Sequence, residues 1–335
     1  MASKDNVTIS DIARKAEVSV STVSRVLSGT VKVSEEKRQA VLSAVAALNY
    51  QPNLFAQGLA SGRSMAIGVL TQNFGSPFYD AIIQGVVQGL NQTEYFPIFA
   101  DGQWQPDIEL EAVQAMMRRQ IDGLIVIGGF LKLADIKKLA EDIPLVMVAR
   151  RLASFEENCV CIDNVEASYL ATQHLIELGH SRIAHVTGRL DQADARDRQQ
   201  GYEKALQAAG IKMRRELTIE GNFRRQSGVL AVQMLLSKRS SFSAIFAAND
   251  QMAYGARLGL YRRGIRVPED LSLVGFDDEP AAAFMIPPLT TVRQPAIELG
   301  HEATRIILAR LKGEPASPAS LKAELVVRES TAIHR

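Results

Sequence analysis

The amino-acid sequence predicts an α/β fold in which a small helical head precedes two doubly wound subdomains, each built on a parallel sheet. Residues 7–48 place apolar side chains at helical spacing. From Met65 onward, short apolar strands alternate with longer helices, and the strands show no polar alternation, as expected when helices cover both faces of a sheet. With 335 residues, 47% of them hydrophobic, the chain is long enough for two or three folded domains.

The first two helices of the head are expected to form a helix-turn-helix. Thr8 is a candidate N-cap, and Asp11 is placed to complete a capping box. Ser19 can cap a second helix that turns Val23 inward and Arg25 outward. The outward face of such a helix is the one that a major groove would meet, where an arginine binds a guanine edge or a phosphate. The pattern is equally compatible with an ordinary helical hairpin whose polar face is solvated.

A third helix and a linker complete the head. Ser34 is expected to cap the third helix, in which Val41 and Val45 begin an apolar stripe. Residues 51–64 follow, and Gly58 within them disfavours a helix of only about two turns. From composition alone this segment is predicted to be a plain linker.

Two series of strands and helices make up the rest of the chain. Strands are expected at residues 66–70, 96–99, 123–127, 145–148 and 159–162, and then at 183–187, 217–220, 244–247 and 271–274. Helices are expected at residues 79–92, 108–119, 134–140, 166–178, 198–209, 227–236, 252–263 and 297–311. Two such sheets facing each other would form a cleft beyond the carboxyl ends of their strands, where ligands of doubly wound folds bind.

The side chains that follow these strands suit a sugar-type ligand. Aromatic rings can pack on a sugar, and carboxylates, amides and arginines can bind its hydroxyls. These side chains lie in residues 72–79, 101–104, 128–129, 150–151, 188–196, 221–223, 249–250 and 277–278. Each also has a structural interpretation, since Asn249 and Asp277 suit helix caps and Trp104 suits the edge of a core.

The sequence contains no catalytic constellation. It has no P-loop, its five histidines are scattered, and no serine occupies a nucleophile elbow. Cys159 and Cys161, the only cysteines, are too closely spaced for a metal site and are expected to be buried structural thiols. We therefore expect no enzyme activity, no cofactor and no bound metal.

Charge and hydropathy indicate a cytoplasmic protein that contacts nucleic acid at one end. Residues 1–64 carry eight Lys and Arg against five Asp and Glu, an excess of three positive charges in a chain of net charge +1. The N-terminus lacks the apolar core of a signal peptide, and no run of about 18 apolar residues occurs, so no membrane association is expected.

Several stretches of the chain carry recognisable motifs in a consistent order. In the head they are VTISDIARKAEVSVSTVSRVLSG and VSEEKRQAVLSAVAALNYQPNLFAQGLASGRS. In the body they are DQADARDRQQGYEKAL, FAANDQMAYGA, VPEDLSLVGFDDEP, PPLTTVRQP and LVVREST. Together they resemble the lactose-repressor (LacI/GalR) family of bacterial transcription regulators over almost the entire chain.

The resemblance implies a domain organisation. A helix-turn-helix headpiece would occupy residues 1–50, a hinge helix would lie within residues 51–64, and a core similar to periplasmic sugar-binding proteins would occupy residues 65–335. In that core, an N-subdomain would comprise about residues 65–163 and 293–325, and a C-subdomain about 164–292. The hinge helices of two subunits would pair in the minor groove of DNA, which replaces the plain-linker interpretation, because a segment too weak to be helical alone suits folding on DNA.

The resemblance also assigns the DNA contacts. Val20 and Ser21 occupy the positions that chiefly discriminate bases, and Arg25 is a third. Val20 has no hydrogen-bonding group, so we expect an apolar contact, for instance with a thymine methyl. Further contacts with bases or phosphates are implied for Thr8, Ser10, Ser19, Thr22, Ser24, Lys32, Tyr50, Asn53, Ala56 and Leu59, the last as a wedge in the central base step.

The effector positions of the family match Arg196, Phe223, Asn249, Asp277 and Gln294, with Phe74, Phe78, Trp104 and Arg150 as cleft neighbours. By this resemblance Arg196 and Asp277 would hold hydroxyls by paired hydrogen bonds, and Phe223 would stack on the ring. Many members carry Asp directly after the strand at 145–148. Here Ala149 and Arg150 stand instead, which is compatible with a phosphorylated, acidic or larger sugar.

The expected function is that of a repressor that binds palindromic double-stranded operator DNA as a homodimer. A sugar or sugar derivative would bind in the cleft, change the angle between the subdomains and release the DNA. The alternative is co-repression by a purine-like ligand. A solute-binding protein of a transporter or a sugar-processing enzyme fits less well, because the first needs an export signal and the second needs a catalytic arrangement. The absence of a heptad-bearing tail predicts a dimer rather than a tetramer.

Overall fold

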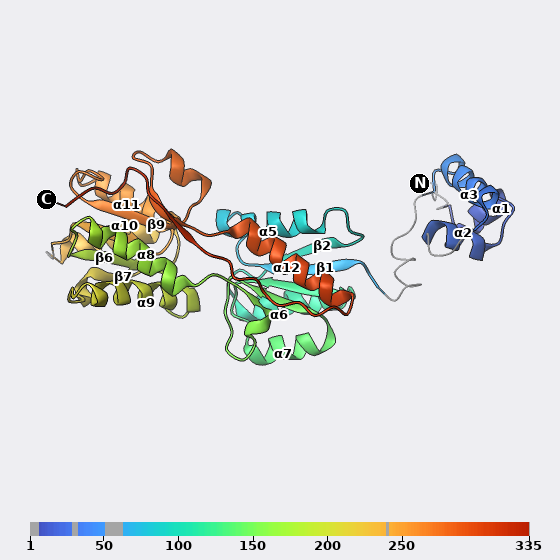
Figure 1. Cartoon of the computed structure of the whole chain (residues 1–335), viewed down its shortest axis with the longest axis horizontal. Coiled ribbons are helices and arrows are strands. Elements are labelled where there is room, and N and C mark those ends of the chain that lie inside the picture. The colour runs from blue at the N-terminus through green and yellow to red at the C-terminus, as the bar shows by residue number, and fades with distance from the viewer. Residues whose placement is uncertain (1–6, 29–32, 51–62, 239–240, 335) are drawn as a thin grey trace. The chain divides into compact units, whose positions relative to one another are not determined.

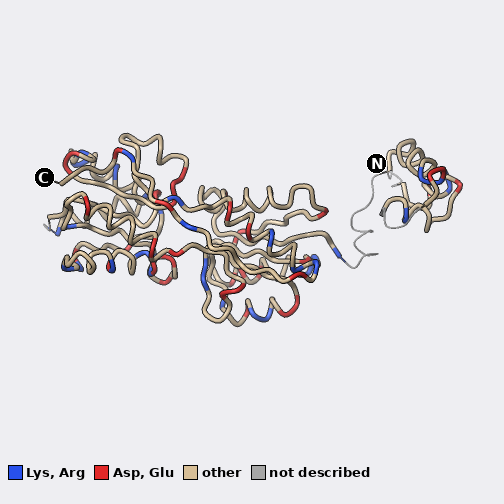
Figure 2. Tube along the Cα trace, viewed as in Figure 1, with Lys and Arg blue, Asp and Glu red and all other residues tan. Residues whose placement is uncertain are grey.

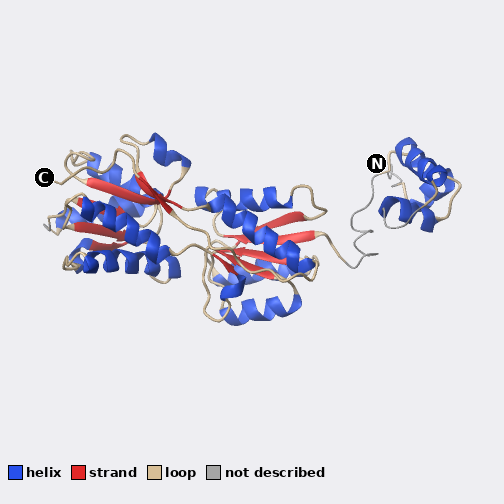
Figure 3. Cartoon of the chain, in the orientation of Figure 1, coloured by secondary structure: helices blue, strands red, loops and turns tan. Residues whose placement is uncertain are grey.

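The computed structural model describes residues 7–28, 33–50, 63–238 and 241–334. They belong to two compact units, one ending at Ser64 and the other beginning at Met65, and each unit is described by itself (Figure 1). The first unit contains packed helices, whereas the second contains two sheets covered by helices (Figure 3).

The head contains α1 (Ile9–Lys15), α2 (Val20–Ser28) and α3 (Glu35–Ala47). Ile12, Val23 and Val41 are fully buried where these helices meet. Charges follow the helix dipoles, since Glu35 lies in the first turn of α3 and Lys15 in the last turn of α1. Figure 2 shows that positively and negatively charged residues occur in both units. The predicted helix-turn-helix and its third supporting helix are confirmed.

The first subdomain of the core has a parallel sheet with the strand order β2-β1-β3-β4-β5. The strands are β1 (Ala66–Thr71), β2 (Phe96–Asp101), β3 (Gly123–Ile127), β4 (Leu145–Val148) and β5 (Cys159–Val160). The helices are α5 (Pro77–Leu90), α6 (Pro106–Met117), α7 (Leu133–Asp142) and α12 (Ala296–Leu311), together with a short 3-10 helix, η1 (Glu156–Asn158). Because β1, β3 and β4 are buried on both faces, they read as continuous apolar runs in the sequence.

Helices from distant parts of the chain cover the two faces of this sheet. The helices α6 and α7 pack on one face, whereas α5 and α12 pack on the other. The last two meet at glycines, because a Cβ at Gly85 or Gly300 would lie 2.1 Å from a carbonyl oxygen of the facing helix. Glycine at both positions therefore lets the backbones of α5 and α12 approach closely.

The second subdomain has a sheet with the order β11-β10-β9-β8-β6-β7, parallel except for the antiparallel pair of β10 and β11. The strands are β6 (Ile183–Thr187), β7 (Thr218–Glu220), β8 (Ala244–Ala247), β9 (Ser272–Asp277), β10 (Thr290–Arg293) and β11 (Glu324–Val326). The helices α8 (Asn164–Glu177) and α9 (Ala193–Ala208) pack on one face, and α10 (Arg225–Ser237) and α11 (Asp250–Tyr261) pack on the other. Short 3-10 helices are η2 (Arg215–Leu217) and η3 (Pro280–Phe284).

The structure confirms the doubly wound α/β fold but differs from the sequence prediction at several strands. The sequence analysis did not predict β10 and β11, and residues 324–325 belong to the second sheet rather than to the N-subdomain range given above. The strand expected at 159–162 contains only Cys159–Val160, and β9 extends to Asp277. The strands β5, β10 and β11 have only two to four residues, and β5 and β11 lie at sheet edges, so they lack the long apolar run on which the prediction rests.

The chain passes between the two subdomains at residues 161–163, 294–295 and 312–323, because α12 packs on the first sheet while β10 and β11 belong to the second (Figure 1). Connections of this kind leave the two sheets as separate bodies joined by short segments. A change in the relative angle of the subdomains would require bending at these residues.

Candidate functional site

The outer face of α2 carries the residues that the sequence assigns to base reading. Val20 is 45% exposed, and Ser21, Ser24 and Arg25 are also exposed, whereas Val23 on the opposite face is fully buried. Short hydroxyl side chains and a guanidinium thus share one helical surface. Such a surface can approach base edges closely in a major groove.

Local hydrogen bonds hold the side chains at the starts of the first two helices. The backbone N–H of Thr8 donates to the Asp11 carboxylate at 2.9 Å, and the Thr8 hydroxyl donates to it at 2.6 Å, which lowers the pKa of Asp11. The N–H of Thr22 donates to the Ser19 hydroxyl at 3.2 Å, and Ser19 also bonds the Ser21 hydroxyl at 2.8 Å. Thr8 and Ser19 therefore cap their helices as predicted.

The remaining residues assigned to DNA lie in different settings. Ser10 is exposed on α1 and Thr22 is half-buried on α2. Tyr50 is half-buried against the apolar core of the head, and its N–H bonds the carbonyl of Val45 at 3.0 Å. Four residues assigned to DNA lie outside the described residues, namely Lys32, Asn53, Ala56 and Leu59. Residues 51–62 of the expected hinge helix lie outside them as well.

A cavity of about 330 Å³ lies between the two subdomains of the core, and its size suits a small-molecule ligand. Residues that follow strands of both sheets line it. Among them are the sequence-predicted effector residues Phe78, Trp104, Phe223, Asn249 and Asp277. The other lining residues are Asn73, Ser76, Tyr79, Gln103, Gln105, Arg189, Gln192, Asp194, Arg198, Asn222 and Arg224. We call this space the main cavity.

Asp277 ends β9 with its backbone in the left-handed region, at a φ of 115°. The side-chain amide of Gln294 donates to its carboxylate at 2.7 Å, and the Arg198 guanidinium lies 3.7 Å away. Burial raises the pKa of Asp277 to about 7, although the Arg198 charge opposes this effect. The carboxyl group can therefore gain or lose a proton near neutral pH.

Asn249 and Asp278 have structural roles that the sequence analysis left open. The Asn249 side-chain oxygen accepts the Met252 N–H at 2.9 Å and so caps α11, while its amide nitrogen donates to the Phe223 carbonyl at 3.0 Å. The Asp278 carboxylate is buried and pairs at 2.7 and 2.6 Å with Arg293 and Arg328. Asn249 is therefore a helix cap, whereas Asp277 is the last residue of β9. The ion pairs of Asp278 connect the end of β9 to Arg293 of β10 and to Arg328.

The buried arginine that lines the main cavity is Arg198, whereas the sequence analysis assigned Arg196 to the effector. Arg198 extends from α9, donates to the Asn164 side chain at 2.9 Å and also donates to the Ala248 carbonyl. Arg196 is exposed, donates to the Leu190 carbonyl at 2.8 Å and does not line the main cavity. Two residues further along a helix is a rotation of about 200°, so the two side chains leave α9 in different directions.

Aromatic rings line the main cavity from both subdomains. The ring of Phe223 packs on Gly188, where a Cβ would lie only 1.9 Å from the ring, so glycine is required there. On the other wall, the centroids of Phe78 and Tyr79 are 5.3 Å apart, and those of Tyr79 and Trp104 are 5.8 Å apart. Tyr79 was not among the predicted effector residues, although it directly follows Phe78.

Four predicted effector residues do not line the main cavity. Phe74 is 50% exposed and does not line the main cavity. Gln294 is buried and acts on the cavity through its hydrogen bond to Asp277. Arg150 and Arg196 both line a neighbouring space.

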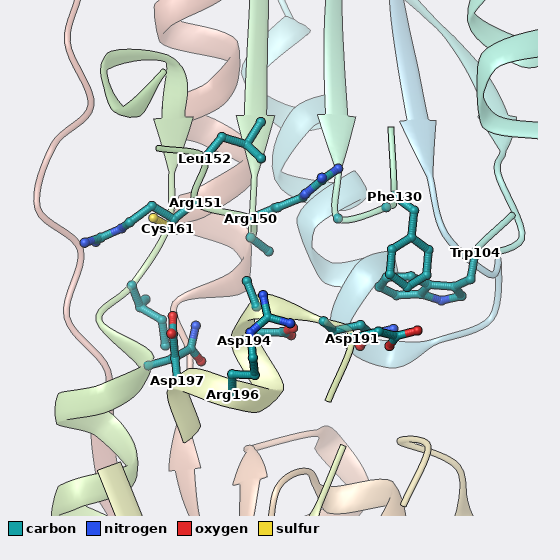
Figure 4. A pocket seen from close by; sticks show the side chains of 17 residues that line it. Trp104, Phe130, Arg150, Arg151, Leu152, Cys161, Asp191, Asp194, Arg196 and Asp197 are labelled. Carbon is teal, nitrogen blue, oxygen red and sulfur yellow. The ribbon is translucent and has the colours of Figure 1, made fainter. Parts of the chain in front are cut away.

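That neighbouring space, which we call the side cavity, has a volume of about 170 Å³ (Figure 4). Trp104, Gln192 and Asp194 line it as well as the main cavity. Cys161 also lines it and is only half-buried, so the prediction of two buried thiols is wrong for this residue. Its strand ends one residue earlier, which places the thiol at the rim of the sheet rather than inside it.

Other kinds of site are not indicated in residues 7–28, 33–50, 63–238 and 241–334. Across these ranges, no group of three or more His, Cys, Asp or Glu side chains could hold a metal ion. Every helix that the structure describes is too short or too polar to cross a membrane.

A helix-turn-helix surface followed by two subdomains that enclose a polar, aromatic cavity defines a ligand-responsive DNA-binding regulator. Comparison with known proteins assigns the family. Residues 8–53 match the family described as bacterial regulatory proteins, lacI family, and residues 172–331 match the periplasmic binding protein-like domain. The chain belongs to the lacI family, whose members are transcriptional regulators rather than enzymes.

Full-length relatives support this assignment. The ribose operon repressor of Haemophilus influenzae is 35% identical over 325 residues, covering 96% of this chain and 98% of the relative. The regulator GalR of Escherichia coli is 36% identical over 309 residues, covering 92% and 90%. The repressor PurR of Mannheimia succiniciproducens is 32% identical over 327 residues, covering 96% and 98%.

Solved structures agree in fold. The lac repressor dimer bound to operator and an anti-inducer superimposes with a TM-score of 0.90 at 30% identity, covering 98% of this chain and all of that one. A complex of the regulator CelR with cellobiose superimposes with a TM-score of 0.73 at 34% identity, covering 97% and 99%.

Proposed function

We propose that this protein is a cytoplasmic transcriptional repressor that binds a palindromic operator as a homodimer and is released by a sugar or sugar derivative. The observation that carries the effector part is the buried pair of Arg198 and Asp277, set with Asn249 between aromatic walls of the main cavity. A carboxylate, a guanidinium and an amide can bind neighbouring hydroxyls of a sugar, while aromatic rings pack on its apolar face.

The residues proposed to read DNA are those of the outer face of α2. Val20 would contact a thymine methyl, and Arg25 would bind a guanine edge or a phosphate. Ser10, Ser19, Ser21, Thr22 and Ser24 offer hydroxyls nearby, and Thr8 supports them by capping α1. For Tyr50 the packing in the head core supports a positioning role at the end of the headpiece.

At the effector, we propose Arg198 in place of Arg196 as the arginine that binds hydroxyls. Arg198 is buried, faces Asp277 and lines the main cavity, whereas Arg196 is exposed outside it. Phe223 would stack on the ring of the ligand, held by its contact with Gly188. Gln294 would orient the Asp277 carboxylate rather than contact the ligand.

An exposed apolar surface supports the homodimer. Exposed side chains of α10 and α11 include Leu230, Met234, Leu258 and Tyr261. Large apolar side chains gathered on one surface are typical of protein interfaces. Two copies related by a twofold axis would place two headpieces on two half-sites, which requires a palindromic operator.

The effector would act by shifting the population of subdomain arrangements. A ligand that contacts both subdomains stabilises one relative angle, and it changes DNA affinity only by its differential affinity for the two states, commonly about 1–3 kcal/mol. Because the main cavity draws residues from both subdomains, its occupant is placed to do this. We propose no catalytic role, because the residues that line the main cavity include no nucleophile paired with a base.

The test begins with an operator selected from random duplexes by the purified protein. Fluorescence anisotropy then measures operator affinity with and without a panel of sugars, sugar derivatives and purine bases. A sugar that weakens operator binding about tenfold or more supports the proposal, and Asp277→Ala should abolish that response while keeping operator binding. Tighter operator binding with a purine would establish co-repression instead, and consumption of a sugar would establish an enzyme. If no compound of the panel changes operator affinity, the proposal of a sugar effector is refuted.

A further inference from the structure

Two loops of the first subdomain carry aromatic rings to the cavities. Trp104, in the loop after β2, lines both the main and the side cavity, and Phe130, in the loop after β3, lines the side cavity. Their ring centroids are 5.5 Å apart, with one ring edge-on to the other (Figure 4). Because both rings belong to loops rather than to strands, their positions depend on what fixes the two loops.

Glu109 fixes the loop after β3. It lies in the first turn of α6, and its side chain is fully buried. Its carboxylate accepts the N–H of Phe130 at 2.8 Å and the N–H of Leu131 at 2.9 Å. A carboxylate offers two acceptor oxygens to such a pair of N–H groups, whereas the amide of a glutamine offers one oxygen and one group that can only donate.

Gln72 fixes the loop after β2. It is fully buried, and its side-chain oxygen accepts the N–H of Trp104 at 2.8 Å. Gln103 and Trp104 both have left-handed backbones, at φ of 53° and 56°. Non-glycine residues adopt this conformation only where their surroundings impose it. The N–H of Gln103 donates to Asp101 at 2.9 Å, so two side-chain acceptors stabilise this turn.

The side chains of Glu109 and Gln72 pack together beneath the two loops. A Cβ at Gly102 would lie 2.5 Å from Glu109 and 2.8 Å from Gln72, and a Cβ at Gly129 would lie 2.7 and 2.6 Å from them. Glycine in each loop therefore lets the backbone rest on both side chains. Neither Glu109 nor Gln72 is among the residues that line the main or the side cavity, so any effect on a ligand passes through the loops.

We propose that Glu109 and Gln72 are positioning residues of the effector site. They fix the rings of Trp104 and Phe130 where a ligand meets the first subdomain, and this inference rests on the proposed function of the main cavity. The guanidinium of Arg189, in the second subdomain, lies 5.4 Å from the centroid of the Phe130 ring. This contact crosses between the subdomains, so the position of the ring also influences which relative angle is favoured.

Trp104 reports its own position without any ligand, because it is the only tryptophan of the sequence. In the full chain, Glu109→Gln and Gln72→Met should each lose most of the tryptophan band of the near-ultraviolet circular dichroism spectrum, because the ring is no longer held in one orientation. Quenching of its fluorescence by acrylamide should increase in both. A residue that only stabilised the fold would lower the urea midpoint and leave this native-state spectrum unchanged.

Controls separate a local effect from loss of the fold. Glu111→Gln makes the same charge change on the same helix at an exposed position, and it should leave the spectrum of Trp104 unchanged. Operator binding in the absence of ligand verifies that each variant is folded. Gln72→Met preserves the shape of the side chain and removes only its polar atoms, so it tests the inference even if Glu109→Gln fails to fold.

Ligand binding is measured by calorimetric titration with glucose, galactose, ribose and cellobiose. We expect Glu109→Gln and Gln72→Met to bind a sugar that binds the wild type about tenfold or more weakly, with operator affinity in the absence of sugar unchanged. Glu111→Gln should bind it as the wild type does.

The outcomes distinguish this inference from the proposed function. If the tryptophan band and the acrylamide quenching of both variants match those of the wild type, the inference is overturned. Wild-type sugar affinity in both variants, or an equal loss in Glu111→Gln, also overturns it, while the main cavity keeps its role. The proposed function fails separately, if no compound of the operator panel changes operator affinity, and the spectroscopic measurement on Trp104 decides the positioning role independently of that result.

Discussion

Replacing Asp277 by Asn should stabilise the unliganded core at neutral and alkaline pH and abolish its response to the effector. Burial raises the pKa of this carboxyl from 3.8 to about 7. Ionisation is therefore harder in the folded than in the unfolded state, so the stability of the wild-type protein falls as pH rises from about 4 to about 7. An asparagine resembles the protonated acid in shape and cannot ionise.

The size of the effect follows from the pKa difference. The shift spans about three pKa units, and each unit corresponds to about 1.4 kcal/mol, so the full difference is roughly 4 kcal/mol above pH 7. The stability advantage of Asp277→Asn should thus grow with pH up to about 7 and then remain constant. The cost is functional, because an amide offers a donor where the ionised carboxylate offers only acceptors to the hydroxyls of a ligand. For the same reason, effector affinity of the wild type should weaken as pH falls below about 7.

Urea denaturation followed by the fluorescence of Trp104 measures this advantage at several pH values from 5 to 9. Taking the difference between variant and wild type removes the contributions of other titrating groups common to both proteins. Asp142→Asn, at an exposed position in the last turn of α7, controls for the loss of one negative charge. A stability difference that stays the same from pH 5 to pH 8 would refute the assignment of a raised pKa to Asp277.

Further predictions concern both units. Arg25→Ala should weaken specific operator binding by about 1–3 kcal/mol and leave effector affinity unchanged, as measured by anisotropy; an equal loss on random DNA would contradict a base-reading role. Arg198→Gln should abolish the operator response to a neutral effector, whereas Arg196→Gln should preserve it, and the reverse pattern would restore the original assignment. Gly188→Ala should displace the Phe223 ring and weaken effector binding in a titration, so unchanged affinity would remove that ring from the site. Val23→Ala should destabilise the head by about 2–3 kcal/mol in thermal denaturation, because Val23 is fully buried in a small core; a smaller loss than for an exposed control such as Val20→Ala would contradict this packing.

Local features of the head could be predicted from the sequence because short-range hydrogen bonds determine them. Thr8 with Asp11, and Ser19 with the N–H three residues later, form caps within a single turn of chain. Ser34 shows the limit of such reasoning, since it occupies the N-cap position of α3 without a side-chain hydrogen bond to the helix. A candidate residue indicates where a helix starts more reliably than how the start is stabilised.

Buried strands could also be predicted, but pairing between distant segments could not. The three-residue strand β11 pairs with β10 although thirty residues separate them in the chain, and neither has the long apolar run of a central strand. The side cavity is a stronger case, because Arg150 and Arg196 line the same space only when both subdomains are in place. Spacing along the sequence carries no signal for such a pair.

The choice between Arg196 and Arg198 depended on helical phase. Buried positions of α9 recur as Ala195, Arg198, Tyr202 and Ala205, at spacings of three and four residues. An arginine on this otherwise apolar stripe must face either the core or the cleft. That pattern is present in the sequence and predicts that Arg198 is the buried arginine of α9, whereas matching motifs without the phase gave Arg196.

The close contact of α5 and α12 has a consequence for synthesis on the ribosome. The helix that covers one face of the first sheet is translated only after the whole second subdomain has emerged up to β10. Until then Val69, Ile125 and Val146 lack half of their apolar cover. The head can fold early on its own residues, but the first subdomain must remain incomplete during most of translation. The nascent chain thus passes through a stage at which an apolar surface is open to chaperones.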